Sequence, residues 1–422
     1  MREYREVVIT GVGVVSPIGI GNDAFWTALD EGRSGIGWLP EFVGKESPFR
    51  YGGMVQGFDG KDYVQPRKTL KVMSREIQQA YAAAVLAMQD ANLTKGSLDP
   101  ERIGVVLGSQ LLDADMEDML EVYRHCQQDG VFCDEQWGEH AMKDLFPLWM
   151  LKYLPNMAAC HIGIANDARG PNNSIVQGGA SSLLAFNEAA LVIQRGHADV
   201  MLTGGSGSLI TISRLPFRGW DQVSKWQGEP AESIRPFDAQ RSGTTFGEGA
   251  GVFVLESREH AERRGAKIWA RVLSYSSRFE PATANAQPRR GAAVKSSIEA
   301  ALHAAGLKPA DIGHVNAHGQ GTLADDRVEA RGIHDALGNA PVTAPKSFFG
   351  DLGGGSGAVE MAVSVIALHK GRVPRTLNYQ TPDPDCPLAV VHGESLSVEK
   401  RTAMVLSQSD TGQAVAVLLA AD

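Results

Sequence analysis

The sequence predicts an α/β fold in which strands alternate with helices. Short β-branched runs such as residues 103–107 lie between stretches whose apolar residues recur at helical spacing. The two parts of the chain also end alike. Residues 246–256 form a glycine- and valine-rich strand region, and residues 404–407 lead through a polar turn to the apolar run 414–419. The repeated ending predicts duplication of one layered unit, with a junction near residues 256–268.

Residues 170–186 predict a strand, a tight turn and a helix in immediate succession. A short β-branched run stops at Gly178 and Gly179, and alanine-, serine- and leucine-rich helical sequence follows at once. A helix N-terminus presents unpaired N–H groups and a positive dipole, which suit a nucleophile or an oxyanion. Position 179 is a glycine, so the predicted elbow carries no nucleophilic side chain.

Composition and charge limit the classes of function. The chain has 422 residues and a net charge of −9, which makes a general nucleic-acid binder improbable because such proteins use clustered positive charge. The four cysteines lack CxxC or Cys/His finger spacing, so neither a disulfide framework nor a zinc site is expected. No apolar stretch is long enough to span a bilayer, and a cytoplasmic location follows as the default expectation.

Residues 67–92 predict one amphipathic helix with a basic face. Arg67, Lys71 and Arg75 are spaced four apart, and Lys68 lies beside them. A solvated helix face explains this pattern, and so does a docking patch for an acidic carrier protein. The acidic, helical stretch 112–150 is open to three interpretations: packing on the body of a domain, a wall of an apolar pocket, or a dimer face.

Several segments, taken together, resemble the β-ketoacyl-acyl carrier protein synthases, the condensing enzymes of the thiolase superfamily. No single motif carries the resemblance; their order and spacing over essentially the whole chain do. The matching segments are Val8-Ile9-Thr10-Gly11-Val12-Gly13-Val14-Val15-Ser16-Pro17-Ile18-Gly19, Arg235-Pro236-Phe237-Asp238, Gly247-Glu248-Gly249-Ala250-Gly251, Asn316-Ala317-His318-Gly319-Gln320-Gly321-Thr322 and Pro382-Asp383-Pro384-Asp385-Cys386.

The resemblance implies a five-layer αβαβα sandwich made of two duplicated halves, usually assembled as a dimer. We place the N-terminal half at residues 1–256, with a helical insertion at about 109–165, and the C-terminal half at 257–422. The family condenses an acyl group held on a cysteine with malonyl on acyl carrier protein. Two histidines donate hydrogen bonds to the developing enolate, and backbone N–H groups stabilise the oxyanion. No cofactor and no resident metal are implied.

The sequence departs from the family pattern at the residues that carry this chemistry. The family cysteine falls on Gly179, the second histidine on Asp351, and the phenylalanine of the C-terminal gating loop on Asp410. His318 matches the first histidine, and Lys346 matches the family lysine. These five residues are the candidate active-site set, and the resemblance implies an active site that is degenerate for condensation.

Two acidic residues after His318 also match the family. Asp326 and Glu329 follow it at the family spacing, and we expect Glu329 to form an ion pair with Lys346 that orients the loop.

The leading hypothesis is a ketosynthase-like protein of acyl carrier protein-dependent fatty acid or polyketide biosynthesis. It would be unable to condense alone and would act like a chain-length factor, paired with itself or with an active ketosynthase, with Lys68 and Lys71 near the carrier-docking face. The alternative is an enzyme with altered acyl-thioester chemistry, in which His318 with Asp351 and Asp410 supports hydrolysis, dehydration or acyl transfer. Whether the chain is an enzyme stays open at this point. Two carboxylates and one histidine could also hold a metal, but we do not expect one there.

Overall fold

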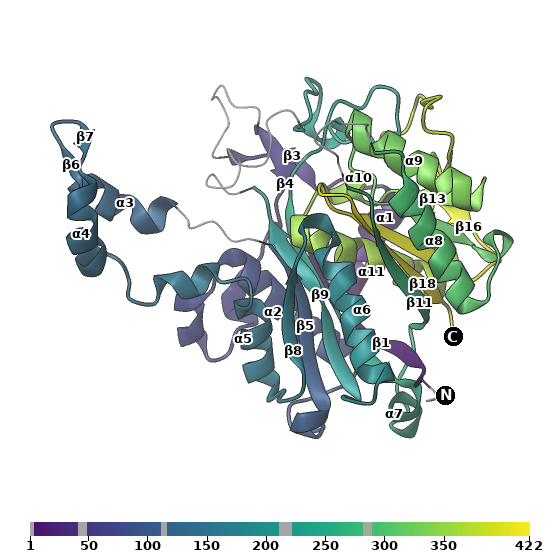
Figure 1. The fold of residues 1–422 in the computed structure, drawn as a ribbon, viewed down its shortest axis with the longest axis horizontal. Helices are drawn as coiled ribbons and strands as arrows, with labels where there is room; N and C mark the ends of the chain where they lie inside the picture. The colour runs from purple at the N-terminus through teal and green to yellow at the C-terminus, as the bar shows by residue number, and fades with distance from the viewer. Residues whose placement is uncertain (1–3, 41–48, 111–115, 211–221, 282–288) are drawn as a thin grey trace.

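The computed structural model describes residues 4–40, 49–110, 116–210, 222–281 and 289–422. Its centre is a 12-stranded mixed sheet with helices on its faces (Figure 1). The predicted α/β class is therefore confirmed. Both expected strand endings are present: β10 covers Glu248–Ser257, and β17 and β18 form an antiparallel hairpin at the end of the chain.

The sheet consists of two units with the same topology. If the five main strands of each unit are numbered 1 to 5 along the chain, they lie side by side in the order 3-2-4-5-1. In both units, strand 4 pairs with strand 5, and strand 5 with strand 1, in antiparallel fashion, and the other two pairings are parallel. The first unit contains β1 (Val7–Ser16), β5 (Ile103–Ser109), β8 (Asn172–Val176), β9 (Val200–Ser208) and β10. The second contains β11 (Ala270–Phe279), β12 (His314–Asn316), β13 (Pro341–Thr343), β17 (Thr402–Gln408) and β18 (Gln413–Ala420).

The two units join where β1 pairs with β11 over Val7–Ile9. The repeated topology agrees with the predicted duplication. The residue limits that we assigned to the two halves stay a prediction; β10 ends at Ser257 and β11 begins at Ala270. The remaining short strands are β2 (Gly19–Ile20), β3 (Ile36–Trp38), β4 (Tyr51–Gly53), β14 (Arg372–Val373), β15 (Ala389–Val390) and β16 (Leu396–Ser397).

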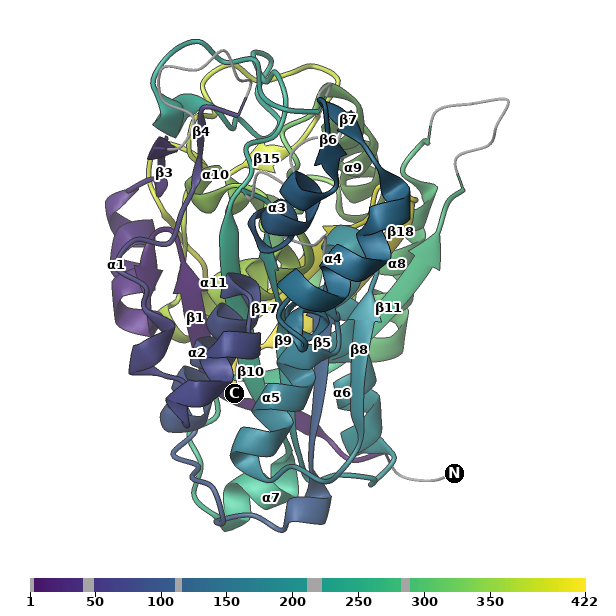
Figure 2. The same cartoon turned by 90° about the vertical axis from the view of Figure 1, so that its left-hand side faces the viewer.

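Helices form layers between and outside the two units (Figure 2). In the middle, α6 (Ser181–Gln194) and α11 (Ser356–Lys370) contribute to a hydrophobic cluster that also contains residues of both units, such as Phe253 and Val417. A second cluster lies under α2 (Arg75–Asp90) and α5 (Met157–Asn166), and a third lies under α8 (Ala292–Ala305) and α9 (Leu323–Leu337). This arrangement is the predicted five-layer sandwich. The other helices of the body are α1 (Asn22–Glu31), α7 (Arg258–Arg263) and α10 (Lys346–Phe349).

The basic stretch at 67–92 is not one continuous helix, so that prediction is wrong. A 3₁₀ helix, η3, covers Arg67–Val72, and α2 begins at Arg75 with the Ser74 side chain accepting a hydrogen bond from Ile77 N. Because Ser74 is a strong N-cap residue, the helix starts afresh there. The break also redirects Arg75, whose guanidinium binds the buried carboxylate of Glu248 at 2.8 Å instead of extending a basic face.

The predicted helical insertion is partly an arm that stands out from the body in Figure 1. The arm contains α3 (Met116–His125), the small hairpin of β6 (Gln127–Gln128) and β7 (Val131–Phe132), and α4 (Trp137–Asp144). Its first residues, 111–115, lie outside the described ones. Across the described ranges, no helix combines the length and the apolar character needed to cross a bilayer.

Candidate active site

The elbow forms as predicted between β8 and α6. The chain leaves β8 at Val176, makes the 3₁₀ turn η7 (Gly178–Ala180), and enters α6 at Ser181. The Ser181 hydroxyl holds this turn together because it accepts from Gln177 N at 2.7 Å and donates to the Gly178 carbonyl at 2.7 Å. Gly178 adopts a φ of +55°, which favours glycine, so the turn depends on the residue type at that position.

The position that a β-carbon of residue 179 would take is crowded by two neighbours. A Cβ atom built on Gly179 would lie 2.6 Å from the backbone carbonyl oxygen of Gln408 and 3.0 Å from Cε1 of His318. The Ser407 hydroxyl donates to the Gly179 carbonyl at 2.7 Å, which holds β17 against the elbow. The structure therefore gives a side chain at position 179 no space without movement of β17 or of the imidazole.

His318 lies in the loop after β12 and is buried. Its backbone N–H donates to Glu329 Oε1 at 2.7 Å, and Gly319 N donates to Glu329 Oε2 at 2.8 Å. Burial raises the pKa of Glu329 to about 8, although these two hydrogen bonds lower it. Glu329 thus fixes the loop that carries His318 by binding its backbone.

The expected ion pair between Glu329 and Lys346 is wrong. Lys346 begins α10 and is fully buried, and its ammonium group binds the carboxylate of Glu360 on α11. Burial lowers the pKa of Lys346, but the charges of Glu360 and Asp351 outweigh it and hold the pKa above its usual value. The physical reason for the different pairing is that the backbone amides of the His318 loop already occupy both Glu329 oxygens.

Asp351 lies opposite His318 and is also buried. Its Oδ1 accepts from Gly353 N at 3.0 Å and from the Ser356 hydroxyl at 2.9 Å, and its Oδ2 accepts from the Gln320 side-chain amide at 2.8 Å. Burial works against ionisation of Asp351, but the charge of Lys346 and these donors lower its pKa overall. The side chain is therefore a carboxylate at neutral pH.

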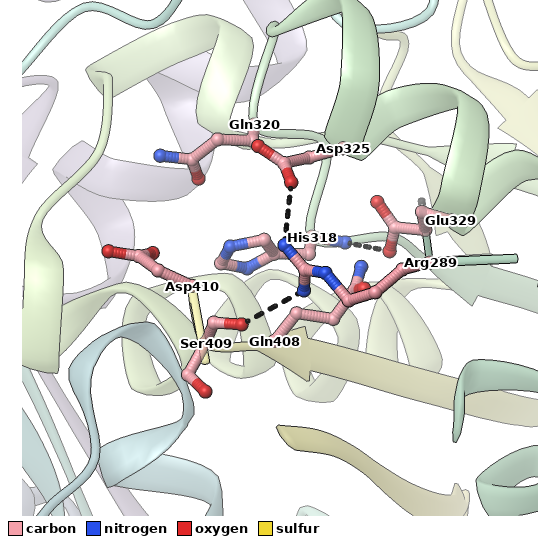
Figure 3. Close-up of a pocket in the computed structure, with 8 residues that line it drawn as sticks. All are labelled: Arg289, His318, Gln320, Asp325, Glu329, Gln408, Ser409 and Asp410. Carbon is pink, nitrogen blue, oxygen red and sulfur yellow. Dashed lines mark hydrogen bonds and ion pairs between the residues drawn. The ribbon is translucent and has the colours of Figure 1, made fainter. Parts of the chain in front are cut away.

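The structure brings four of the five candidate active-site residues together at two adjoining pockets, and Lys346 lines neither of them. One pocket is lined by Gly179, His318, Asp351 and Asp410, and the other by His318, Asp410 and Arg289. Figure 3 shows the second pocket, where the Arg289 guanidinium donates to Asp325 at 3.2 Å and to the Ser409 carbonyl at 3.4 Å. Asp410 lies exposed in the turn between β17 and β18 and reaches both pockets.

The electrostatics of the site limit what His318 can do. Burial, followed by the positive charge of Lys346, lowers the pKa of His318 to about 3. The imidazole is consequently neutral at pH 7 and a weak base. Its Nδ1 has no hydrogen-bond partner among the described residues and lies 4.0 Å from Glu360 Oε2. A neutral imidazole in this position is better suited to donating a hydrogen bond than to removing a proton.

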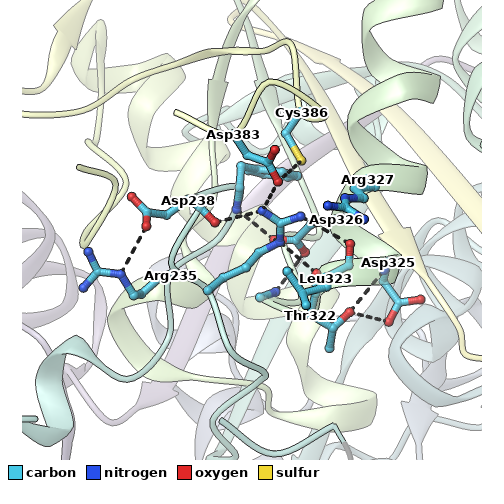
Figure 4. Close-up of polar contacts among 12 residues, drawn as sticks. Arg235, Asp238, Thr322, Leu323, Asp325, Asp326, Arg327, Asp383 and Cys386 are labelled. Carbon is cyan, nitrogen blue, oxygen red and sulfur yellow. Dashed lines mark hydrogen bonds and ion pairs between the residues drawn. The ribbon is translucent and has the colours of Figure 1, made fainter. Parts of the chain in front are cut away.

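A second group of buried charges lies behind the His318 loop (Figure 4). The carboxylate of Asp326 accepts from the backbone N–H groups of Phe237 and Gly321 at 2.8 and 2.9 Å. Arg241 lies 3.6 Å from Asp326 and binds Asp383 at 2.7 Å. These contacts join three motifs that are distant in the sequence, so Asp326 and Arg241 position the loop without lining either pocket.

Lys68 and Lys71, the expected carrier-docking residues, both lie exposed on η3. Residues three apart eclipse in a 3₁₀ helix, so these two side chains share one side. The carrier contact itself stays a prediction.

Sequence reasoning missed Glu360, Gln320 and Arg289. A signal for Glu360 was available. It is the single acidic residue of α11 and has apolar residues on both sides, and a charge in such a place is rarely buried without a partner. Nothing in the spacing of Gln320 or Arg289 indicated their places in the pockets.

The duplicated sandwich, with an elbow that faces a buried histidine, defines a condensing-enzyme fold of the thiolase superfamily. Family models match most of the chain: the β-ketoacyl synthase N-terminal domain over residues 4–261, and the C-terminal domain over residues 269–380. The chain belongs to the β-ketoacyl synthase family.

Curated relatives match over nearly their full length. The 3-oxoacyl-(acyl-carrier-protein) synthase 2 of Synechocystis sp. is 34% identical over 398 residues, which cover 93% of this chain and 92% of the relative. The enzyme of the same name from Vibrio cholerae is 34% identical over 385 residues, or 90% of each chain.

Solved structures agree in fold. A β-ketoacyl synthase from Burkholderia phymatum superposes with a TM-score of 0.88 at 28% identity, covering 99% of this chain and all of that one. The ishigamide ketosynthase/chain length factor gives 0.85 at 27% identity, with the same coverage. A type II polyketide synthase acyl-carrier protein in complex with its ketosynthase, bound to the hexaketide, gives 0.84 at 28% identity, again covering 99% of this chain and all of the matched chain.

Proposed function

We propose that this chain is a ketosynthase-like partner subunit of acyl carrier protein-dependent fatty acid or polyketide biosynthesis that does not condense alone. The observation that carries the proposal is the elbow. Gly179 supplies no nucleophile, and the Gln408 carbonyl lies 2.6 Å from where a β-carbon would be. Loss of an essential nucleophile typically costs several orders of magnitude in rate.

The replaced residues around the elbow support the same proposal. Decarboxylation of malonyl needs a hydrogen-bond donor at the position of Asp351, but Asp351 is a carboxylate that accepts three hydrogen bonds. A malonyl carboxylate would meet like charge there, and such repulsion is worth a few kcal/mol in a pocket of low dielectric. The site therefore disfavours decarboxylation as well as acylation.

The exposed surface of the arm supports the proposal that this chain binds a protein partner. Its helices and hairpin expose large apolar side chains, which on soluble proteins mark interaction sites. The exposed fraction reaches 88% at Met142 and 65% at Val131; the others are Met116, Leu120, Tyr123 and Phe132. The names of two structural relatives, a ketosynthase/chain length factor and a ketosynthase in complex with its carrier protein, agree with partners of these two kinds.

Co-expression tests the partner role. The chain is produced with a ketosynthase encoded near its own gene, and the mixture is analysed by size-exclusion chromatography with light scattering, which also separates homodimer from heterodimer. We expect a stable complex and a change in product length or rate when this chain is present. A chain that stays separate from the ketosynthase and alters neither property contradicts the proposal.

The second candidate is altered acyl-thioester chemistry at the same pocket. The observation in its favour is that His318, Asp351 and Asp410 line one pocket with Gly179. Against it, the low pKa of His318, near 3, makes the imidazole a weak base, and the oxygens of Asp351 bind Gln320, Gly353 and Ser356. Turnover of acyl-carrier thioesters by the wild type that is lost in His318→Ala would establish this chemistry and overturn the non-catalytic role.

A further inference from the structure

Two histidines and an aspartate meet on the arm, far along the chain from the elbow. His125 is the last residue of α3, and His140 and Asp144 are one turn apart on α4. Residues four apart share one face of a helix, so α4 presents His140 and Asp144 together toward the end of α3. The β6–β7 hairpin connects the two helices, and Figures 1 and 2 both show α3 and α4 side by side.

The distances between the donor atoms fit the coordination of one metal ion. His125 Nδ1 lies 2.7 Å from Asp144 Oδ2, and His140 Nδ1 lies 3.5 Å from the same oxygen. One ligand atom from each of the three residues can be chosen such that all lie within 4.8 Å of one another. Tetrahedral bonds of about 2.0–2.1 Å place neighbouring ligand atoms roughly 3.3 Å apart. The His140 contact is close to this spacing, and the His125 contact needs to open by about 0.6 Å.

One of these donor atoms is unsatisfied. His140 Nδ1 is buried and has no hydrogen-bond partner among the described residues, although it points at the Asp144 carboxylate from 3.5 Å. A buried polar atom without a partner is costly, so it requires an explanation. The short contact between His125 and Asp144 does not account for His140, because His140 Nδ1 makes no hydrogen bond to that carboxylate.

The surroundings permit a metal to enter. The side chains of His125, His140 and Asp144 are 49%, 25% and 15% exposed, so the site is open on one side. We propose that His125, His140 and Asp144 bind a divalent transition-metal ion of the zinc type, which ties α3 to α4 and stiffens the arm. Two imidazoles and one carboxylate are ligands that zinc accepts, and at least one further position is left for water.

Two cysteines lie close to these residues in the sequence, and their sulfur atoms are the alternative metal ligands to consider. Cys126 follows His125 and is buried, and Cys133 N donates to the Cys126 carbonyl at 2.7 Å across the base of the hairpin. Neither sulfur belongs to the group of ligand atoms within 4.8 Å. The proposed site is therefore ligated by nitrogen and oxygen, without thiolate.

Metal titration of the full chain tests the proposal. The purified protein is treated with a chelator, dialysed, and titrated with Zn²⁺ by calorimetry, with bound zinc measured by elemental analysis. We expect one equivalent in the wild type and at least about tenfold weaker binding in His125→Ala, His140→Ala and Asp144→Asn. The control is His334→Ala, because His334 is an exposed histidine 3.9 Å from Asp335 and belongs to no group of three ligand residues in the described part of the chain. This variant should bind zinc like the wild type.

Absence of saturable zinc binding by the wild type, or equal binding by the three variants and His334→Ala, overturns the proposal. If an alanine variant misfolds, His140→Asn tests the same ligand with a smaller change of shape. The absorption spectrum of the wild type loaded with Co²⁺ tests the ligand set without any variant. That spectrum should show ligand-field bands without thiolate charge transfer. A charge-transfer band that disappears in Cys126→Ser overturns the assigned donor set.

Discussion

Substitution of Gly179 tests the idea that the elbow has lost both the nucleophile and the space for one. A β-carbon at this position would lie 2.6 Å from the Gln408 carbonyl oxygen and 3.0 Å from Cε1 of His318. Ordinary contacts begin near 3.4 Å, so the carbonyl must retreat by about 0.8 Å. The carbonyl belongs to the end of β17, which pairs with β18, and cannot yield like a flexible side chain.

The expected cost follows from overpacking. Inserting atoms into a closely packed site costs about 1–3 kcal/mol. Gly179 does not have the positive φ of its neighbour Gly178, so backbone strain adds little and the contact with Gln408 decides the result. We expect Gly179→Ala and Gly179→Cys to lower the midpoint of thermal or urea unfolding. Gly37→Ala is the matched control, because a β-carbon there meets no atom within 4 Å.

The cysteine variant adds a functional readout. Gly179→Cys should not accumulate an acyl-enzyme when incubated with acyl-carrier thioester, as followed by mass spectrometry of the intact protein, and should not condense. If Gly179→Cys is as stable as Gly37→Ala and becomes acylated, then β17 does not block the elbow and the reasoning about the site is refuted.

Three further predictions follow from buried and surface charges. Burial raises the pKa of Glu256, but hydrogen bonds from its neighbours outweigh burial and lower the pKa from 4.5 to about 2. This shift contributes about 3 kcal/mol to the free energy of unfolding above pH 4.5. The contribution is lost as the pH falls toward 2. Glu256→Gln should remove that stability at pH 7 and flatten the acid limb of unfolding. Lys346→Met should cost about 3–5 kcal/mol because it leaves Glu360 buried and unpaired, and Glu360→Met in the same chain should restore much of the loss. Reversing Lys68 and Lys71 to glutamate should weaken binding of an acidic carrier protein at low salt and reduce its salt dependence.

Each of these predictions has an outcome that would contradict it. An unchanged acid limb in the Glu256 variant would show that its neighbours do not lower its pKa. Additive losses in the double methionine variant would show that the buried pair is not coupled. Lys95→Glu is the control for carrier binding because Lys95 is exposed and lies outside η3. Equal weakening by Lys95→Glu would assign the effect to net charge.

Local sequence signals were sufficient for the α/β class and for the elbow, whereas the five-layer sandwich was predicted from the family resemblance. A β-branched run that ends at Gly178 and Gly179 and continues into a helix-forming sequence has one compact solution, and the same pattern of endings occurs in both halves. The boundary at Ser74 was missed because the apolar spacing continues across it, whereas the hydrogen bond that restarts the helix is a single side-chain contact.

Partner choice among buried charges could not be predicted in the same way. Both Glu329 and Glu360 belong to helices that reach the His318 loop, and spacing alone does not decide which one meets Lys346. Backbone hydrogen bonds decide which glutamate pairs with Lys346. The N–H groups of His318 and Gly319 bind both oxygens of Glu329, so the ammonium group binds Glu360 instead. Backbone donors of this kind leave no trace in the residue pattern.

The residues at positions 179 and 351 depend on one another in physical terms. With glycine at 179, the imidazole of His318 packs against the elbow instead of against a side chain. With a carboxylate at 351, the charge of Lys346 is shared between Glu360 and Asp351, and the neighbouring Gln320 donates to Asp351. Restoring the cysteine alone would place a thiol in a pocket that the carboxylates of Asp351 and Asp410 also line, and negative charge raises a thiol pKa and opposes formation of a thiolate. The proposed function therefore predicts that a return to condensation requires changes at positions 179 and 351 together, and also a shift of β17.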